Sequence, residues 1–121
     1  MRIFKLKFFH KWARKEGLTN KSLKETIQEM DKGLIGNELG GFVYKKRVAI
    51  QGRGKRSGVR TLIAFKHNNK AFFMYGFAKN QLDNIEPQEL KALKRLAKEL
   101  FSYNDNGINK AIKAKEIIEV I

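Results

Sequence analysis

Cationic side chains alternate with apolar ones along two neighbouring stretches of this sequence. Lys45 and Arg47 lie two residues apart in FVYKKRVA (residues 42–49), and Arg60 lies near the start of VRTLIAFK (residues 59–66). Arginine stays protonated and can stabilise charge on a phosphate, while a lysine crowded by other cations has a lowered pKa and can transfer protons. The combination is suited to cleavage of RNA by its own 2′-hydroxyl group, which needs a positioned phosphate but no metal ion.

The positive charge is concentrated in the middle third of the chain. The sequence has 26 Lys and Arg residues against 12 Asp and Glu residues, which gives a net charge of +14. Residues 39–80 contain ten of the cations and no acidic residue, whereas residues 81–121 contain seven residues of each sign. Lysines that only keep a surface soluble would be scattered, so the acid-free block favours a polyanionic partner, most commonly nucleic acid.

A basic, glycine-rich segment, QGRGKRSG over residues 51–58, connects the two stretches. It is not a P-loop, because Arg56 follows Lys55 where that motif needs Ser or Thr, and Ser57 replaces the third glycine of the dinucleotide fingerprint. We therefore predict a loop between two strands whose Arg53, Lys55 and Arg56 bind the RNA backbone.

A third stretch, AFFMYGFAK over residues 71–79, combines aromatic residues with the alternation of a strand. Tyr75 and Phe77 share one face of this strand, and aromatic rings beside cations can stack on the bases of single-stranded RNA. We predict Tyr75 as such a ring, with a place in the core as an equally weighted alternative. Lys66 shares the face of Arg60 and is predicted to contact RNA, with a solvated position beside a turn as its alternative.

Apolar periodicity predicts the elements that position these residues. A short strand (RIFKL) precedes two helices, of which the first ends at Gly17 and the second is capped by Thr19 and ends near Gly33. The following GNELGG is predicted as a turn, and the next three strands form an antiparallel meander. Pro87 begins a third helix at its first position, and residues 111–121 close the chain as a short helix or strand.

This order of elements predicts an α+β fold with a single domain over residues 1–121. We expect a helical hairpin and a C-terminal helix packed on a small antiparallel sheet, with the cations exposed on the sheet's open face. The sequence has no cysteine and two histidines, so we expect no metal site. No apolar run approaches the length of about 20 residues that a membrane span needs, and we expect a cytoplasmic protein.

The segments RGKRSGVRTLIAF and FFMYGFAKN, which follow a helical hairpin, resemble the RelE/ParE superfamily of toxins from bacterial type II toxin–antitoxin systems. The start of the chain, MRIFKLKFFHKWARKEGL, is similar to RelE-like and HigB-like members, so the resemblance spans nearly the whole chain. It implies helices packed on an antiparallel sheet, metal-independent cleavage of mRNA, often in the ribosomal A site, and a basic surface masked by a cognate antitoxin.

The resemblance also implies roles for individual residues. Arg60 matches the arginine that contacts the scissile phosphate in such toxins. Lys45 and Arg47 match the alternating cations that are implicated in proton transfer and charge stabilisation. Lys79 matches the basic position that ends the last strand, and Asn80 follows it in the same segment as an expected RNA contact. Some ribosome-dependent members carry a tyrosine or histidine near the C-terminus, where this chain offers only Tyr103.

We therefore predict a ribosome-dependent mRNA endoribonuclease that inhibits translation and needs no cofactor. Its expected partners are a cognate antitoxin, mRNA and the ribosome with its rRNA, and the toxin alone is expected to be monomeric. Two alternatives stay open, because a fold does not choose an activity. A ParE-like toxin would inhibit DNA gyrase without cutting RNA, and a non-catalytic basic module would bind nucleic acid and do nothing further.

Overall fold

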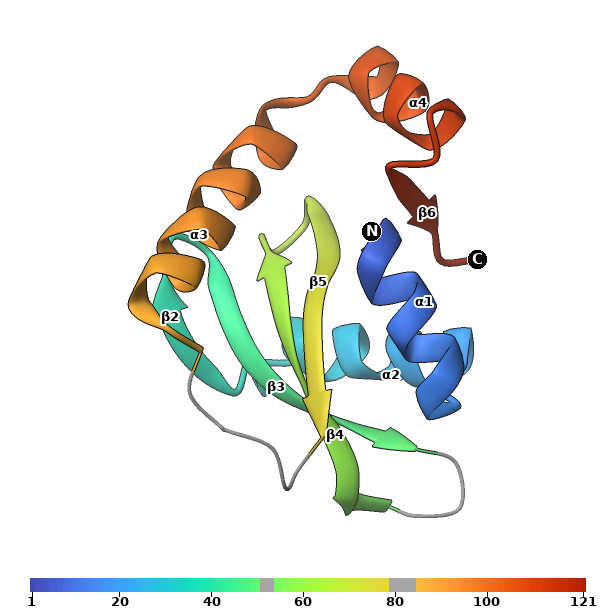
Figure 1. The fold of residues 1–121 in the computed structure, drawn as a ribbon, viewed down its shortest axis with the longest axis vertical. Coiled ribbons are helices and arrows are strands. Elements are labelled where there is room, and N and C mark those ends of the chain that lie inside the picture. The colour runs from blue at the N-terminus through green and yellow to red at the C-terminus, as the bar shows by residue number, and fades with distance from the viewer. Residues whose placement is uncertain (51–53, 79–84) are drawn as a thin grey trace.

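The structure is a computed structural model that describes residues 1–50, 54–78 and 85–121. In this part of the chain, six strands form one sheet (Figure 1). The side chains of residues 54–57 are outside this description. The spatial order is β2-β3-β4-β5-β1-β6. The strands are β1 (Arg2–Leu6), β2 (Asn37–Gly40), β3 (Val43–Ile50), β4 (Gly54–Phe65), β5 (Lys70–Ala78) and β6 (Ile117–Glu119). Strand β1 runs parallel to β5, and the other neighbouring strands are antiparallel.

Helices cover both faces of this sheet. The helices are α1 (Lys7–Glu16), α2 (Asn20–Asp31), α3 (Pro87–Ser102) and α4 (Asp105–Lys113). Helices α1 and α2 pack against one face, and α3 and α4 pack against the other. In Figure 1, α3 runs along the left side of the sheet and α4 lies at the top beside β6. The arrangement is an α+β fold, as the order of elements in the sequence predicts.

Helix boundaries follow from the capping residues that the sequence predicts. Gly17 ends α1 in the left-handed conformation, with a φ of 77°. The side chain of Thr19 accepts a hydrogen bond from the backbone N–H of Ser22 at 3.1 Å and so caps α2. Pro87 occupies the first turn of α3, where its missing N–H has no consequence. The predicted helical hairpin is therefore confirmed.

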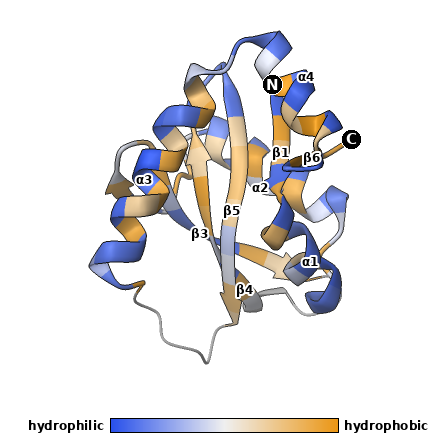
Figure 2. Cartoon of the chain, turned by 45° about the horizontal axis from the view of Figure 1, so that its top comes forward, coloured by the Kyte–Doolittle hydropathy of each residue, from blue (hydrophilic) through white to orange (hydrophobic). Residues whose placement is uncertain are grey.

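Stacked aromatic rings fill the hydrophobic core on each side of the sheet. The rings of Phe9 and Phe73 stack with centroids 5.3 Å apart under α1. On the other face, Phe4 stacks on Phe72 at 5.2 Å, and Phe101 of α3 meets Phe72 edge-on at 5.6 Å. Figure 2 shows apolar residues along the strands and alternating polar and apolar bands along α3, as expected for a helix that buries one face.

Several predictions about the elements were wrong. The segment GNELGG, predicted as a turn, contains the edge strand Asn37–Gly40, and β4 begins at Gly54 inside the predicted loop. Residues 111–121 contain both the end of a helix and a strand, where a single element was predicted. The sheet face that was expected to be open is covered in part by α3 and α4. The covered face results from contacts between segments distant in sequence, whereas β2 and the start of β4 pair with nearby residues of β3 and were hidden by glycines typical of turns.

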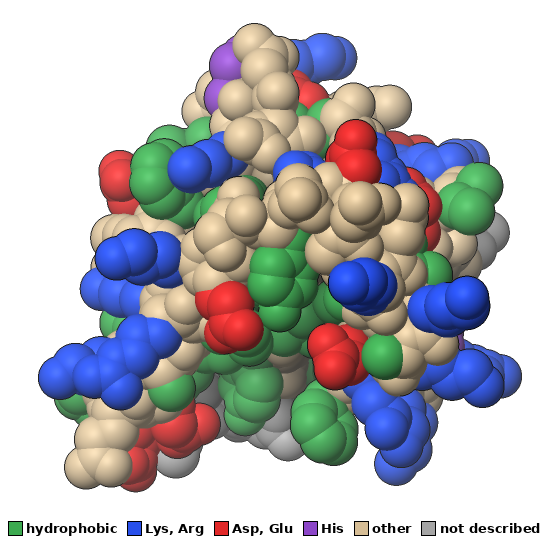
Figure 3. Space-filling view, turned by 90° about the horizontal axis from the view of Figure 1, so that it is seen from above, with side chains coloured by type: hydrophobic (Ala, Val, Ile, Leu, Met, Phe, Trp, Pro, Cys, Tyr) green, Lys and Arg blue, Asp and Glu red, His purple; other side chains and the backbone are tan. Residues whose placement is uncertain are grey.

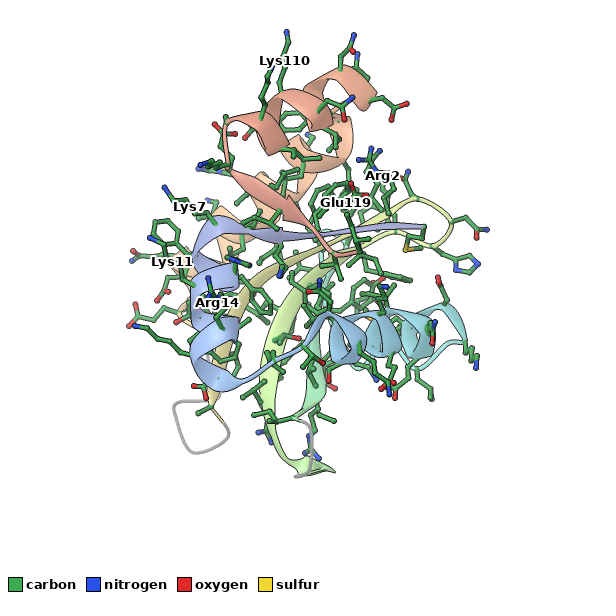
Figure 4. The ribbon with its side chains drawn as sticks, turned by 90° about the vertical axis from the view of Figure 1, so that its right-hand side faces the viewer. Arg2, Lys7, Lys11, Arg14, Lys110 and Glu119 are labelled. Carbon is green, nitrogen blue, oxygen red and sulfur yellow. The ribbon has the colours of Figure 1, made fainter. Side chains whose placement is uncertain are left out.

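Strand β6 is attached to β1 by an ion pair as well as by the backbone. The guanidinium of Arg2 donates two hydrogen bonds to the carboxylate of Glu119, at 2.8 and 2.9 Å. Figure 4 shows these two side chains near each other above the sheet. The hydrogen bonds from Arg2 lower the pKa of the Glu119 carboxyl. The pair therefore stabilises the fold above the pKa of an unfolded glutamate, and this contribution is lost as the pH falls through the lowered value.

Lys5 is a buried cation on β1, between β5 and the edge strand β6, with 7% of its surface exposed. Its ammonium donates to the side-chain oxygen of Asn20 at a long 3.3 Å. Burial lowers the pKa of Lys5, and the positive charge of Arg14 lowers it further. The charged form of Lys5 is thus less stable in the folded chain than in water.

We expect the substitution Lys5→Met to raise the free energy of unfolding at pH 7 by about 1 kcal/mol, because it removes this desolvated charge. Both the folded and unfolded states carry the proton at pH 7, so the full penalty is present there. The advantage should shrink as the pH rises through the lowered pKa toward 10.5, which thermal melts at pH 7 and pH 10 would measure. Lys24→Met, at an exposed position of α2, is the control; an equal gain from both variants would show that burial of the charge is not the cause.

Candidate functional site

Strand pairing places the two predicted arginines of the site side by side. Arg47 of β3 lies directly opposite Arg60 of β4, and Arg60 in turn lies opposite Phe77 of β5. Residues in such pairs share one face of the sheet, with Cβ atoms about 5 Å apart. Two like charges at directly opposite positions destabilise a sheet, so the pair Arg47 and Arg60 lowers the stability of the fold. Residues that lower stability in this way are typical of functional sites.

The next row of the sheet adds a lysine and a tyrosine on the same face. Lys45 lies opposite Leu62, and Leu62 lies opposite Tyr75. Leu62 and Phe77 belong to the hydrophobic cluster under α3, so both rows are on the α3 side of the sheet. We call the four polar members of the two rows the cationic face: Lys45, Arg47, Arg60 and Tyr75.

The cationic face is accessible, although helices cover the rest of this side of the sheet. Strands β3 and β4 extend beyond the helices at the bottom of Figure 1, at the end where β3 ends and β4 begins, and the row of Arg47 is nearer to that end than the row of Lys45. Arg47 is exposed and Lys45 and Arg60 are half-buried. Tyr75 exposes 43% of its surface. Arg47 and Tyr75 are therefore the most accessible members of the cationic face, and Lys45 and Arg60 are partly accessible.

A β-bulge directs Tyr75 toward the cationic face. Leu62 pairs with Tyr75 whereas the next residue of β4 pairs with Phe73, so Met74 is an extra residue in β5. In a regular strand, Tyr75 and Met74 would lie on different faces of the sheet. Because of the bulge, both lie on the face that α3 covers. The ring of Tyr75 then lies 6.1 Å from the ring of Phe77, measured between centroids.

The space behind the bulge is filled by Trp12 of α1. A Cβ atom at Gly76 would clash with three ring atoms of Trp12, so only glycine fits at this position. Neither residue was predicted to belong to the site. A glycine in the interior of a strand is a known sign of a bulge or of close approach, and Gly76 in MYGF carried that signal. Trp12 and Gly76 therefore position Tyr75 from the opposite face.

Lys46 lies on the other face of β3, as strand alternation predicts. Its ammonium forms an ion pair with Glu29 of α2 at 2.9 Å, and its side chain is 10% exposed. The hydroxyl of Thr61 donates to its backbone carbonyl at 3.0 Å. Lys46 thus anchors α2 to the sheet, and only the cations in phase with Arg47 belong to the cationic face.

Two predicted or considered residues lie away from this face. Lys66 directly follows the last residue of β4, and its ammonium lies 4.7 Å from the ring centroid of Phe42 and 5.1 Å from that of Phe101. Tyr103 is half-buried beyond the end of α3, and its hydroxyl hydrogen bonds to Glu99 at 3.3 Å. Burial, followed by the negative charge of Glu99, raises the pKa of Tyr103. The structure does not bring either residue to the two arginines.

The remaining predicted site residues fall outside the described part of the chain. Arg53, Lys79 and Asn80 are among the residues that are not described. Lys55 and Arg56 have a described backbone within β4, but their side chains are not described. Their proposed contacts with RNA stay predictions.

Basic residues also cover surfaces outside the middle third of the sequence. Lys7, Lys11 and Arg14 are exposed at successive turns of α1, and Figure 4 shows them along one side of that helix. Lys110 extends from α4 at the top of the same view. Figure 3, seen from above, shows Lys and Arg side chains spread over much of that face. A long-range attraction for polyanions therefore acts over several sides of the molecule.

Neither a metal cluster nor a membrane-crossing helix occurs within the described ranges. No group of three or more His, Cys, Asp or Glu side chains there is placed to hold a metal ion. None of the helices described there is both long and apolar enough to cross a membrane.

Comparison with known proteins identifies the family of the chain. The family model described as the RelE toxin of the RelE / RelB toxin-antitoxin system matches residues 1–120. No curated protein matches the chain. The family match covers almost the full length, including every strand that carries the cationic face. The chain therefore belongs to the RelE toxin family, and this membership implies a toxin whose partner is a cognate antitoxin.

Proposed function

We propose that this protein is an mRNA endoribonuclease that acts on translating ribosomes in the cytoplasm and is neutralised by its antitoxin. One observation carries the proposal: Arg47 and Arg60 face the same way from directly opposite positions, with Lys45 and Tyr75 in the adjacent row. Two guanidinium groups about 5 Å apart at their Cβ atoms can bind one phosphodiester from two sides. A lone basic residue on a surface could not do this.

The proposed reaction uses the RNA's own 2′-hydroxyl group as the nucleophile. Its oxygen attacks the neighbouring phosphorus, the P–O5′ bond breaks, and the products are a 2′,3′-cyclic phosphate and a 5′-hydroxyl. Arg60 and Arg47 stabilise the negative charge that develops on the non-bridging oxygens. Lys45 stands in the next row and is assigned to proton transfer, a role that Lys79 would share. The protein's main contribution is to hold the phosphate and the 2′-hydroxyl in line.

Tyr75 is assigned to stacking on a base next to the scissile phosphate. Its ring is exposed on the same face as the arginines and is supported by Phe77. Stacking of a base on an aromatic ring contributes about 1–3 kcal/mol and does not need the hydroxyl group.

We expect Tyr75→Ala to lower kcat/KM for RNA cleavage by about tenfold to a hundredfold, whereas Tyr75→Phe should stay near the wild-type value. The reason is that the phenylalanine ring keeps the stacking surface and removes only the hydroxyl. Cleavage of a labelled RNA by the two purified variants, each checked by circular dichroism, measures the difference. Equal losses in both variants would show that the hydroxyl, and not the ring, is needed.

Primer extension on a defined mRNA, with and without translating ribosomes, tests the proposed activity. Cleavage that requires ribosomes would support the full proposal, and cleavage of naked RNA would retain the nuclease but remove the ribosome. A supercoiling assay with DNA gyrase runs in parallel. Folded protein that inhibits gyrase and leaves RNA intact would replace the proposal with a ParE-like activity.

A further inference from the structure

A groove of about 690 Å³ lies between α3 and the turn that precedes β3. It lies on the same side of the sheet as the cationic face and begins at the residues that precede β3, whereas the cationic face begins at Lys45 within that strand. Its floor contains the rings of Phe42 and Phe101. Cations surround the floor, and no acidic side chain of the described chain lines the groove. The five cations are Lys66, Lys91, Lys94, Arg95 and Lys98. We call this feature the α3 groove.

Phe42 lines the groove and has a left-handed backbone conformation, which is unfavourable for a residue with a Cβ atom. Gly40, Gly41 and Phe42 all have positive φ, at 89°, 61° and 64°. The left-handed region is costly for a residue with a Cβ, and such outliers persist where the surrounding structure imposes them. Phe42 nevertheless keeps 49% of its surface exposed while its ring meets Phe101 at a centroid distance of 6.1 Å. The turn thus presents an aromatic ring that the core does not bury.

The cations of α3 form a single stripe along the groove. Lys91, Lys94, Arg95 and Lys98 follow the three- and four-residue spacing that places side chains on one face of a helix. They extend over about 10 Å of the helix axis. A helical segment that carries acidic residues at the same spacing could pair with this stripe and place apolar residues on the two rings. This is the geometry in which an amphipathic helix docks in a groove.

The position of Lys66 favours a polypeptide over a nucleic acid as the occupant. Its ammonium lies 4.7 Å and 5.1 Å from the centroids of the two floor rings. A stacked base would have to displace this ammonium from the rings. A carboxylate can pair with the ammonium where it is, and aliphatic side chains can pack against the exposed remainder of Phe42.

We propose that the α3 groove binds an acidic, amphipathic segment of the cognate antitoxin. The inference rests on the toxin–antitoxin family of this chain and on the charge of the groove, not on RNA cleavage. Phe42 precedes Lys45 by three residues and Arg47 by five, which is about 10 Å and about 16 Å of extended chain. None of the four residues of the cationic face lines the groove, so an antitoxin segment bound there contacts different side chains.

Charge reversal in the groove tests this proposal by isothermal titration calorimetry of the full-length toxin with its purified antitoxin. We expect Lys91→Glu with Lys98→Glu to weaken the affinity at least tenfold. The matched control is Lys110→Glu with Lys113→Glu, which changes the net charge equally at exposed positions of α4 and should alter the affinity less than twofold. Equal weakening by both pairs, or by neither, would overturn the proposal.

A second variant tests the aromatic floor without altering charge. Phe42→Asn removes the ring and keeps a residue type that tolerates positive φ, so the turn should be preserved. We expect the antitoxin affinity to fall at least fivefold with an unchanged melting temperature. An unchanged affinity, together with a loss of binding to a labelled single-stranded oligoribonucleotide, would assign the groove to nucleic acid instead. Because calorimetry is done without RNA, its result is independent of whether the toxin is a nuclease.

Discussion

Arg60→Ala should reduce RNA cleavage by about a hundredfold to a thousandfold and abolish growth arrest, while the protein stays folded. This is the range observed when one preorganised donor to a developing oxyanion is removed. Arg60 is the central member of its row, between Arg47 on β3 and Phe77 on β5. Its loss leaves a single arginine on the phosphate, and the strand retains the neighbouring buried residues Val59 and Leu62 that hold it in place.

Two further variants separate the charge of Arg60 from its shape. Arg60→Lys keeps one positive charge but loses the planar pair of donors, so we expect an intermediate rate. Arg14→Ala removes an exposed arginine of α1 and serves as the control for a general loss of basic charge. The rates come from primer extension, and circular dichroism checks the fold. If folded Arg60→Ala still arrests growth at the wild-type level, Arg60 has no part in the reaction.

Strand alternation explains why the composition of the cationic face could be predicted from the sequence. Residues two apart in a regular strand lie on the same face of the sheet. It could therefore be predicted that Lys45 and Arg47 share one face of β3 and that Lys46 lies on the other. The same rule placed Tyr75 and Phe77 together. Membership of one row, in contrast, depends on the register between strands, which the sequence did not reveal.

The errors in the predicted elements have more than one physical cause. The parallel pairing of β1 with β5 joins the first strand to one about seventy residues later, and no local pattern encodes it. The edge strand Asn37–Gly40 was hidden by glycines that normally mark turns. Phe42 was assigned to a strand, but its positive φ turns its ring toward α3. The α3 groove was therefore not predictable from alternation.

The largest expected effect on stability comes from Gly58→Ala, because the space beside this glycine is occupied by backbone. A Cβ there would clash with the carbonyl oxygen of Val48 on the neighbouring strand and would lie 3.1 Å from the carbonyl carbon. Backbone within a sheet cannot rotate away as a side chain can. We expect the free energy of unfolding to fall by about 3 kcal/mol, the upper part of the range for overpacked positions. Thermal melts would measure this as a loss of about 10 °C or more.

Gly17→Ala is the matched control, since it tests backbone strain where space is free. Gly17 has a φ of 77° and no atom within 4 Å of the position that a Cβ would take, whereas the φ of Gly58 is outside the left-handed region. The control should lower stability by only about 1 kcal/mol. If both variants melt at the same temperature, the contact with the Val48 carbonyl is relieved at little cost, and lack of space does not limit the sheet at Gly58.

Gly58→Ala should also impair cleavage at temperatures where the variant is still folded. Gly58 is two residues from Arg60, and Val48 is adjacent to Arg47, so relief of the clash must shift β4 against β3 next to the arginine row. A displacement of about 1 Å in a positioned catalytic group can reduce a rate a hundredfold. Gly17→Ala, at the far end of α1, should cleave RNA at the wild-type rate. A folded Gly58→Ala protein with full activity would mean that the reaction tolerates movement between the two arginines, and that one of them alone positions the phosphate.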